Sequence, residues 1–113
     1  MKKIEAIIRP EVFAAVRESL AKEGIDGLSI SEIAGCGRQE GRTALFRGNQ
    51  YSMKISQKLK LEMVVDNTKV QAIIDVILRD ASTGEVGDGK IFIYPVEQAI
   101  RIRTKEVGSV AID

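Results

Sequence analysis

The stretch that decides the fold runs from Lys58 to Ala81 and reads KLKLEMVVDNTKVQAIIDVILRDA. Its first part alternates apolar and polar side chains, a pattern typical of a half-buried strand, with apolar residues at Leu59, Leu61, Met63 and Val65. Its second part carries one apolar stripe at helical spacing, formed by Val70, Ile73, Ile74, Ile77 and Ala81. Asn67 stands where it can cap this helix. The stretch therefore predicts a strand followed by a helix.

The chain before this stretch shows strand and helix signals in the same order. Lys2–Arg9 is rich in isoleucine and predicts a strand, and Pro10 suits the first turn of a helix. Apolar residues then recur at helical spacing until Gly24 ends the pattern, at Phe13, Val16 and Leu20. From Leu28 to Cys36, leucine and isoleucine alternate with serine, which predicts another strand.

Two glycine-containing loops interrupt the regular elements. Residues 37–56 have no sustained period of 2 or 3.6, and residues 83–90 follow the second helix with three glycines. Ile91–Val96 predicts a last strand, and Pro95 suggests that it ends there or lies at a sheet edge. The order βαββαβ predicts a single α+β domain over residues 1–113, a ferredoxin-like sandwich with both helices on one sheet face. A long mobile loop is expected between the second and third strands of this fold. The sheet face that the helices leave bare is compatible with oligomerisation.

Composition excludes several functional classes before any motif is considered. The chain has no histidine and one cysteine, which removes the usual zinc clusters, Ser-His-Asp triads and internal disulfides. A net charge of +1 predicts neither nucleic acid nor an acidic surface as a partner. Because no signal-peptide core or long apolar stretch is present, we expect a cytoplasmic protein without direct membrane insertion.

Positive charge is nevertheless concentrated locally. From Gly37 to Lys60 the chain carries +5, because Glu40 alone opposes the cations Arg38, Arg42, Arg47, Lys54, Lys58 and Lys60. Two interpretations stay open, a contact segment for an anionic ligand or protein partner and a solvated surface loop.

The loop at residues 83–90 and the pair Arg101/Arg103 form a second candidate site. The loop leads from a helix into a strand, the reverse of the order that a P-loop or Rossmann motif requires. Glycine amides can still approach phosphate oxygens closely, and Lys90 supplies a point charge. If residues 100–103 are extended, Arg101 and Arg103 project on one side and fit a polyphosphate. The alternatives are a plain tight turn and a salt-bridged edge.

These segments together resemble the PII signal-transduction family of nitrogen regulation. The resemblance covers essentially the whole chain and rests on MKKIEAIIRP at 1–10, GRQEGRT at 37–43, LFRG at 45–48 with Tyr51, TGEVGDGKIF at 83–92, PVE at 95–97 and IRIRT at 100–104. The glycine-lysine loop with the arginine pair is its most specific part.

The resemblance implies a non-enzymatic regulator that forms a compact homotrimer. ATP or ADP is expected in each cleft between subunits, and 2-oxoglutarate beside Mg²⁺-ATP. The family's T-loop corresponds to about residues 37–56, its B-loop to about 83–90 and its C-loop to about 104–113. The T-loop is expected to dock on an ammonium transporter or a nitrogen-metabolism enzyme.

The resemblance also assigns roles to individual residues. Nucleotide binding is implied for Ser29, Arg38, Val64, Gly87, Asp88, Gly89, Lys90, Arg101 and Arg103. Among them, Ser29 and Val64 match positions at the adenine base, and the others match positions at or near the phosphates. Gln39 matches the ligand of Mg²⁺ at the effector site, and Lys58 matches the partner of a 2-oxoglutarate carboxylate. Tyr51 matches a tyrosine that is modified in some members, and Arg47 an arginine that some insert into the pore of an ammonium channel.

The T-loop departs from the family pattern at Glu40, Gln50 and residues 54–57. The alternative function is therefore a PII relative that regulates carbon or bicarbonate metabolism through adenine-nucleotide sensing. Two other classes use the same fold. An RNA-recognition module needs stacking aromatics on its central strands, which Leu59–Glu62 lacks. An acyl-phosphate hydrolase needs a positioned base, and no Asp or Glu stands out as one.

Overall fold

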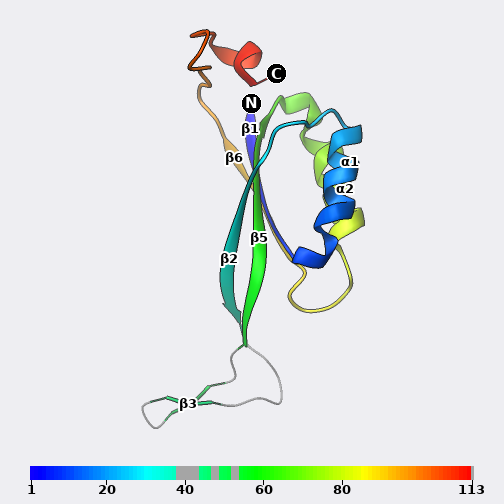
Figure 1. Ribbon diagram of the computed structural model, residues 1–113, viewed down its shortest axis with the longest axis vertical. Coiled ribbons are helices and arrows are strands. Elements are labelled where there is room, and N and C mark those ends of the chain that lie inside the picture. Colours follow the sequence, from blue (N-terminus) through cyan, green and yellow to red (C-terminus); the bar gives the residue numbers. More distant parts are fainter. Residues whose placement is uncertain (38–43, 47–48, 52–53, 113) are drawn as a thin grey trace.

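The computed structural model describes residues 1–37, 44–46, 49–51 and 54–112, with side chains described for 1–35 and 55–112. It shows a four-stranded antiparallel sheet with two helices on one face (Figure 1). The strands of this sheet are β1 (Lys2–Ile8), β2 (Ser29–Gly37), β5 (Lys54–Val65) and β6 (Gly89–Pro95), and the helices are α1 (Phe13–Lys22) and α2 (Val70–Ala81). The short strands β3 (Ala44–Phe46) and β4 (Asn49–Tyr51) pair with each other, and 3-10 turns span η1 (Pro10–Val12), η2 (Asn67–Lys69) and η3 (Gly108–Ile112).

The sheet order is β2-β5-β1-β6, which places β1 between β5 and β6. Ile4 of β1 lies opposite Met63 of β5 on one side and Ile93 of β6 on the other. β6 is an edge strand whose last residue is Pro95, as its sequence predicted. This arrangement confirms the ferredoxin-like βαββαβ fold.

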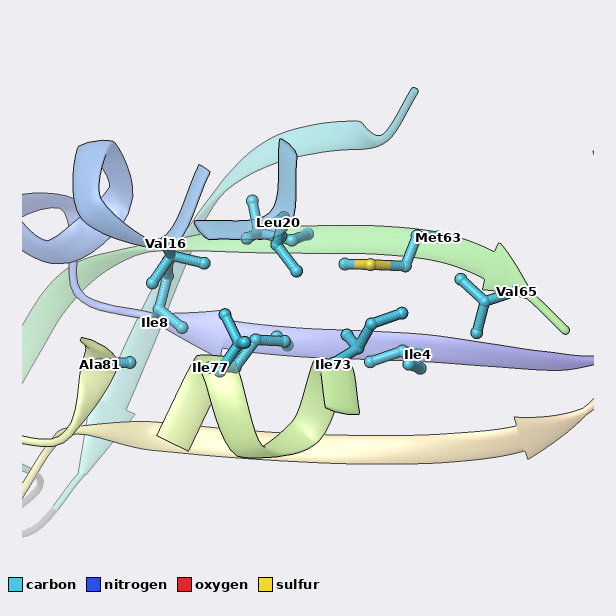
Figure 2. Close-up of a cluster of buried hydrophobic side chains, with 12 residues drawn as sticks. Ile4, Ile8, Val16, Leu20, Met63, Val65, Ile73, Ile77 and Ala81 are labelled. Atoms are coloured by element: carbon cyan, nitrogen blue, oxygen red, sulfur yellow. The ribbon is translucent and has the colours of Figure 1, made fainter. Parts of the chain in front are cut away.

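The hydrophobic core lies between the sheet and the two helices (Figure 2). Every second residue of β1 is buried, and the alternating apolar residues of β5 share the same face. They meet apolar residues of both helices, so that the cluster includes Ile4, Ile8, Leu61, Met63, Val16, Leu20, Ile73 and Ile77. The apolar stripe predicted for residues 70–81 is therefore confirmed as the face of α2 that covers the sheet.

The cap predicted at Asn67 was wrong. The carboxylate of Asp66 accepts the Thr68 amide at 3.3 Å and the Thr68 hydroxyl at 2.6 Å. These bonds cap η2, the 3-10 turn that precedes α2, so the helical path begins before Val70. The sequence signal was displaced by one residue because two adjacent side chains, Asp66 and Asn67, are both good caps.

β5 begins four residues earlier than the alternating pattern predicted, because its pairing with β2 continues to Gly37 opposite Lys54. Residues 54–57 are therefore strand rather than irregular loop. This part of the β2–β5 ribbon extends past the helices (Figure 1), and Ile55 is 73% exposed. Without a buried face, nothing imposes the alternation by which a strand is recognised. Among the described residues, no helix is long and apolar enough to cross a membrane.

Candidate functional site

The loop from Thr83 to Lys90, which corresponds to the expected B-loop, is organised around the carboxylate of Asp88. This carboxylate accepts the Thr83 amide at 2.8 Å, the Gly84 amide at 3.0 Å and Nε of Arg9 at 3.1 Å. The Thr83 hydroxyl also donates to it, and that bond is the main cause that lowers the pKa of Asp88 well below its ordinary value. Asp88 therefore holds the shape of the loop through contacts within the protein.

Two glycines of this loop have left-handed backbone, and at one of them, Gly89, a side chain does not fit. Gly89 has a φ of +111°, and a Cβ at this position would lie 1.7 Å from the carbonyl oxygen of Ile7. Gly87 has a φ of +101°, and its Cβ would lie 3.3 Å from Nη2 of Arg9 and 3.4 Å from Nζ of Lys58. The missing side chain of Gly89 allows β6 to begin close beside β1. The missing side chain of Gly87 leaves its backbone accessible next to Arg9 and Lys58.

Three cationic residues, in or next to three different strands, lie at the same end of the sheet. Arg9, which follows β1, donates from Nη2 to the carbonyl of Val86 at 2.8 Å. Lys58 of β5 donates to the carbonyl of Gly87, and Lys90, the second residue of β6, is exposed and paired with Ile7. Backbone amides next to fixed cations form an environment suited to an anion. The sequence alone did not assign Arg9 to this site, because its contacts with Val86 and Asp88 depend on the pairing of β1 with β6.

Ser29 and Val64 lie at the other end of the sheet. They share a cavity of about 410 Å³ with Lys3, Gly27, Leu28, Glu62 and Met63. Ser29 stands opposite Glu62 in the β2–β5 ladder, and Val64 lies two residues beyond Glu62. The cavity thus combines an apolar side chain with a hydroxyl and backbone groups, a combination that suits a heterocyclic base.

Arg101 and Arg103 follow β6 in a turn, so the prediction of an extended segment was wrong. The Lys105 amide donates to the Arg101 carbonyl at 2.8 Å, and Ile100 pairs with Val107 in an isolated bridge. The chain reverses here because the Arg101 amide also donates to the Glu106 carbonyl at 2.9 Å. Residues 101–103 therefore lack the extended backbone on which alternate side chains share one side.

The predicted nucleotide-binding residues fall into two groups at opposite ends of the sheet. In β6, Gly89 lies opposite Ile8 and Pro95 lies opposite Lys2, which corresponds to a separation of about 20 Å along the strand. Figure 1 shows the loop before β6 and the tail after it at opposite ends of this strand. One subunit therefore brings Gly87–Lys90 together with Lys58 and Arg9, and separates them from Arg103.

Several predicted site residues fall outside the part of the chain that the structure describes in full. Arg38, Gln39 and Arg47 lie outside the described residues, and the side chain of Tyr51 is not described. The predicted ligand of Mg²⁺ is among them. Within the described ranges, no group of three or more Cys, Asp or Glu residues could hold a metal ion.

The sheet face that the helices leave open carries a network of paired charges. Lys3 contacts Glu62 at 2.7 Å, and Lys60 contacts Glu5 at 3.5 Å and Glu62 at 3.6 Å. The Tyr94 hydroxyl donates to Glu5 at 2.6 Å, which lowers the pKa of Glu5 and raises that of Tyr94. Because opposite charges already neutralise one another, another protein surface can cover this face without leaving an isolated charge.

Comparisons with known proteins agree with this architecture. The family model described as nitrogen regulatory protein P-II matches residues 1–106. The nitrogen regulatory protein P-II of Nostoc punctiforme is 52% identical over 112 residues, which cover 99% of this chain and 100% of that protein. The nitrogen regulatory protein P-II 1 of Escherichia coli is 48% identical with the same coverage.

Solved structures give the same result. The GlnK protein of B. subtilis superposes with a TM-score of 0.82 at 37% identity, covering 97% of this chain and 96% of that one. The PII protein of Arabidopsis thaliana, solved with bound citrate, gives 0.79 at 38% identity, covering 99% and 89%. Sequence and fold therefore agree along nearly the whole length, and this chain belongs to the nitrogen regulatory protein P-II family, whose members are signal-transduction regulators.

Proposed function

We propose that this P-II protein is a non-enzymatic, cytoplasmic regulator that senses ATP and ADP at sites shared between the subunits of a homotrimer. The observation that carries this proposal is the separation of the candidate site into two groups about 20 Å apart along β6. A nucleotide cannot be held by both groups of one subunit. It can be held by one group from each of two neighbouring subunits.

A ring of three subunits satisfies this requirement at every interface. In a head-to-tail ring, each subunit presents one end of its sheet to the opposite end of the next, so all sites are equivalent. One subunit would offer the phosphates the backbone of Gly87 and Gly89 and the ammonium group of Lys90. Its neighbour would offer Arg101 and Arg103 to the phosphates, and the cavity at Ser29 and Val64 to the adenine base.

We further propose that 2-oxoglutarate binds beside the nucleotide. Lys58 lies at the base of the T-loop and already contacts the B-loop at the Gly87 carbonyl. It stands close to Arg9, so a dicarboxylate there would meet two cations. Mg²⁺, held by the Gln39 side chain and the nucleotide phosphates, would join the effector to the nucleotide. The bound citrate of the Arabidopsis relative supports the idea that small carboxylates bind proteins of this fold.

We expect the T-loop to transmit the response to ligand binding to a partner protein. The position of the T-loop between β2 and β5 links it directly to the strand that carries Lys58. We propose that it docks on an ammonium transporter or a nitrogen-metabolism enzyme, with Arg47 and Tyr51 at the contact.

Calorimetric titration tests the nucleotide proposal directly. Wild-type protein is titrated with ATP, ADP and AMP, with and without Mg²⁺ and 2-oxoglutarate, and light scattering gives the oligomeric state. Lys90→Ala should weaken ATP and ADP binding by about ten- to a hundredfold, because one charge-assisted hydrogen bond is lost. Lys22→Ala is the matched control, since Lys22 is 75% exposed and lies on α1. A monomer, or equal affinity in both variants, would contradict the proposal.

A further inference from the structure

The guanidinium group of Arg101 is bound by the C-terminal tail. Its Nη1 donates to the carboxylate of Glu106 at 2.8 Å, and its Nη2 donates to the carbonyl of Val110 at 2.8 Å. The backbone closes the same turn, because the Arg101 amide donates to the Glu106 carbonyl at 2.9 Å. Arg101 and Glu106 thus form a clasp that combines a charged pair with backbone hydrogen bonds.

This clasp uses the groups that a phosphate would need. Carboxylate and phosphate oxygens both accept short charge-assisted hydrogen bonds from the guanidinium nitrogens of arginine. The side chains of Arg101 and Glu106 are 31% and 39% exposed, so a ligand can reach the pair from solvent. A phosphate that took both terminal nitrogens would displace Glu106 and the Val110 carbonyl together.

We infer that Glu106 is an internal competitor of the nucleotide phosphates at Arg101, and that nucleotide binding releases the tail from Glu106 to Ile112. The inference rests on the proposed nucleotide site and adds its regulation. Val110 belongs to η3, the turn Gly108–Ile112, so loss of its bond to Arg101 loosens this turn. The tail thereby reports whether the neighbouring site is filled.

The opposite role for Glu106 makes an opposite prediction. A carboxylate that only orients Arg101 toward the phosphates would help binding, and its removal would weaken affinity. A competing carboxylate hinders binding, and its removal strengthens affinity. The sign of the change therefore distinguishes competition from positioning.

The test compares Glu106→Gln with wild type in calorimetric titrations with ATP, ADP and inorganic pyrophosphate. A partly exposed ion pair corresponds to a change of about two- to fivefold, and we expect tighter binding by that factor. Glu18→Gln is the matched control, because Glu18 is also a surface carboxylate paired with a cation, Lys22 at 3.6 Å. Glu106→Ala should give the same direction, and circular dichroism verifies that both variants fold.

Amide hydrogen exchange supplies a second measurement. In wild type, ATP should increase exchange over residues 107–112, whereas in Glu106→Gln exchange should be high before ATP is added. Unchanged or weaker binding in Glu106→Gln, while wild type binds ATP, would overturn this inference alone. No binding of any nucleotide to either protein would overturn the proposed function and this inference with it.

A substitution at Lys105 should change the nucleotide affinity in the direction opposite to Glu106→Gln, and so tests the inference independently. Lys105 lies in the turn of the clasp with a φ of +64°, a left-handed conformation that glycine adopts more easily. Lys105→Gly should therefore tighten the clasp and weaken nucleotide binding relative to Lys105→Ala, which removes the same charge and keeps the strain. Equal affinities in these two variants would contradict the competition between clasp and phosphate.

Discussion

Gly89 lies so close to Ile7 that a Cβ on the glycine would come within 1.7 Å of the isoleucine carbonyl oxygen. The contact occurs where the B-loop enters β6 and β6 begins to pair with β1. The absence of a side chain at Gly89 thus permits the close approach at which the B-loop passes into the edge strand.

Gly89→Ala should destabilise the protein more than Gly84→Ala. Both glycines have positive φ values, +111° and +85°, but no atom lies within 4 Å of a Cβ at Gly84. Each change incurs the left-handed penalty of about 1–2 kcal/mol, and only Gly89→Ala adds a steric clash of about 1–3 kcal/mol. Chemical denaturation measures the difference. Equal free energies of unfolding in the two variants would mean that the close approach to Ile7 does not constrain the loop.

Mixed trimers should recover a binding site that neither parent variant has. If Lys90 and Arg103 of one site come from different subunits, a trimer of two Lys90→Ala subunits and one Arg103→Ala subunit contains one intact site. The reason is the distance of about 20 Å along β6 that separates these groups within a subunit. Co-expression with two different affinity tags isolates such trimers, and titration with ATP measures the sites.

The control for this experiment is an equal mixture of separately purified, unexchanged Lys90→Ala and Arg103→Ala trimers. It should show only the weak affinity of the parents. If the isolated mixed trimers also bind ATP no better than the parents, both residues act within one subunit and the shared site is wrong.

The B-loop should loosen in acid because of Asp88. Its pKa is lowered by donation from Thr83, so its contribution to stability is present above the ordinary aspartate value of about 3.9 and is lost as the pH falls through its lower folded value. The NMR shifts of the Thr83 and Gly84 amides, which donate to this carboxylate, should stay constant from neutral pH to about 4 and change only below it.

Asp88→Asn is the control for this titration. It removes the titrating group at nearly constant size, so the acid-dependent change at Thr83 and Gly84 should disappear. A transition in wild type near pH 6, or the same transition in Asp88→Asn, would show that another group governs the loop.

The sequence predicted the fold well because burial imposes a readable pattern on it. Residues 59–65 and 70–81 face one core, and their periods of 2 and 3.6 follow directly from that geometry. The part of the ribbon beyond the helices packs against no such core, so the sequence of residues 54–57 shows no alternation of apolar and polar side chains. The helix cap is Asp66 rather than the predicted Asn67, because both neighbouring side chains can accept the hydrogen bond and the sequence does not decide between them.

The site was less predictable because its contacts depend on which strands become neighbours. Arg9 meets Asp88 across 79 positions of sequence, and only the β1–β6 pairing brings them together. Arg101 and Arg103 looked like a strand pair because alternate positions share a side in extended chain. Instead, the chain turns, because Arg101 forms hydrogen bonds with Glu106. Local sequence propensity does not predict that Arg101 and Glu106 pair.

Lys58 should be the residue through which 2-oxoglutarate acts on the T-loop. It donates to the Gly87 carbonyl, so it connects the base of the T-loop with the B-loop. A carboxylate of the effector would compete for the same ammonium group, while Mg²⁺ bound at Gln39 would fix the other end of the loop. The effector would therefore act on the T-loop at both ends, since a ligand shifts an equilibrium only through such differential contacts.

Hydrogen exchange over residues 37–58 measures this effect in the presence of Mg²⁺-ATP. Addition of 2-oxoglutarate should change exchange in wild type and in Lys22→Ala, and should leave it unchanged in Lys58→Ala. The affinity for 2-oxoglutarate should fall by about ten- to a hundredfold in Lys58→Ala, since a charge-assisted hydrogen bond is lost. Identical exchange in wild type with and without 2-oxoglutarate would reject this switch and leave adenine nucleotides or another small anion as the signal.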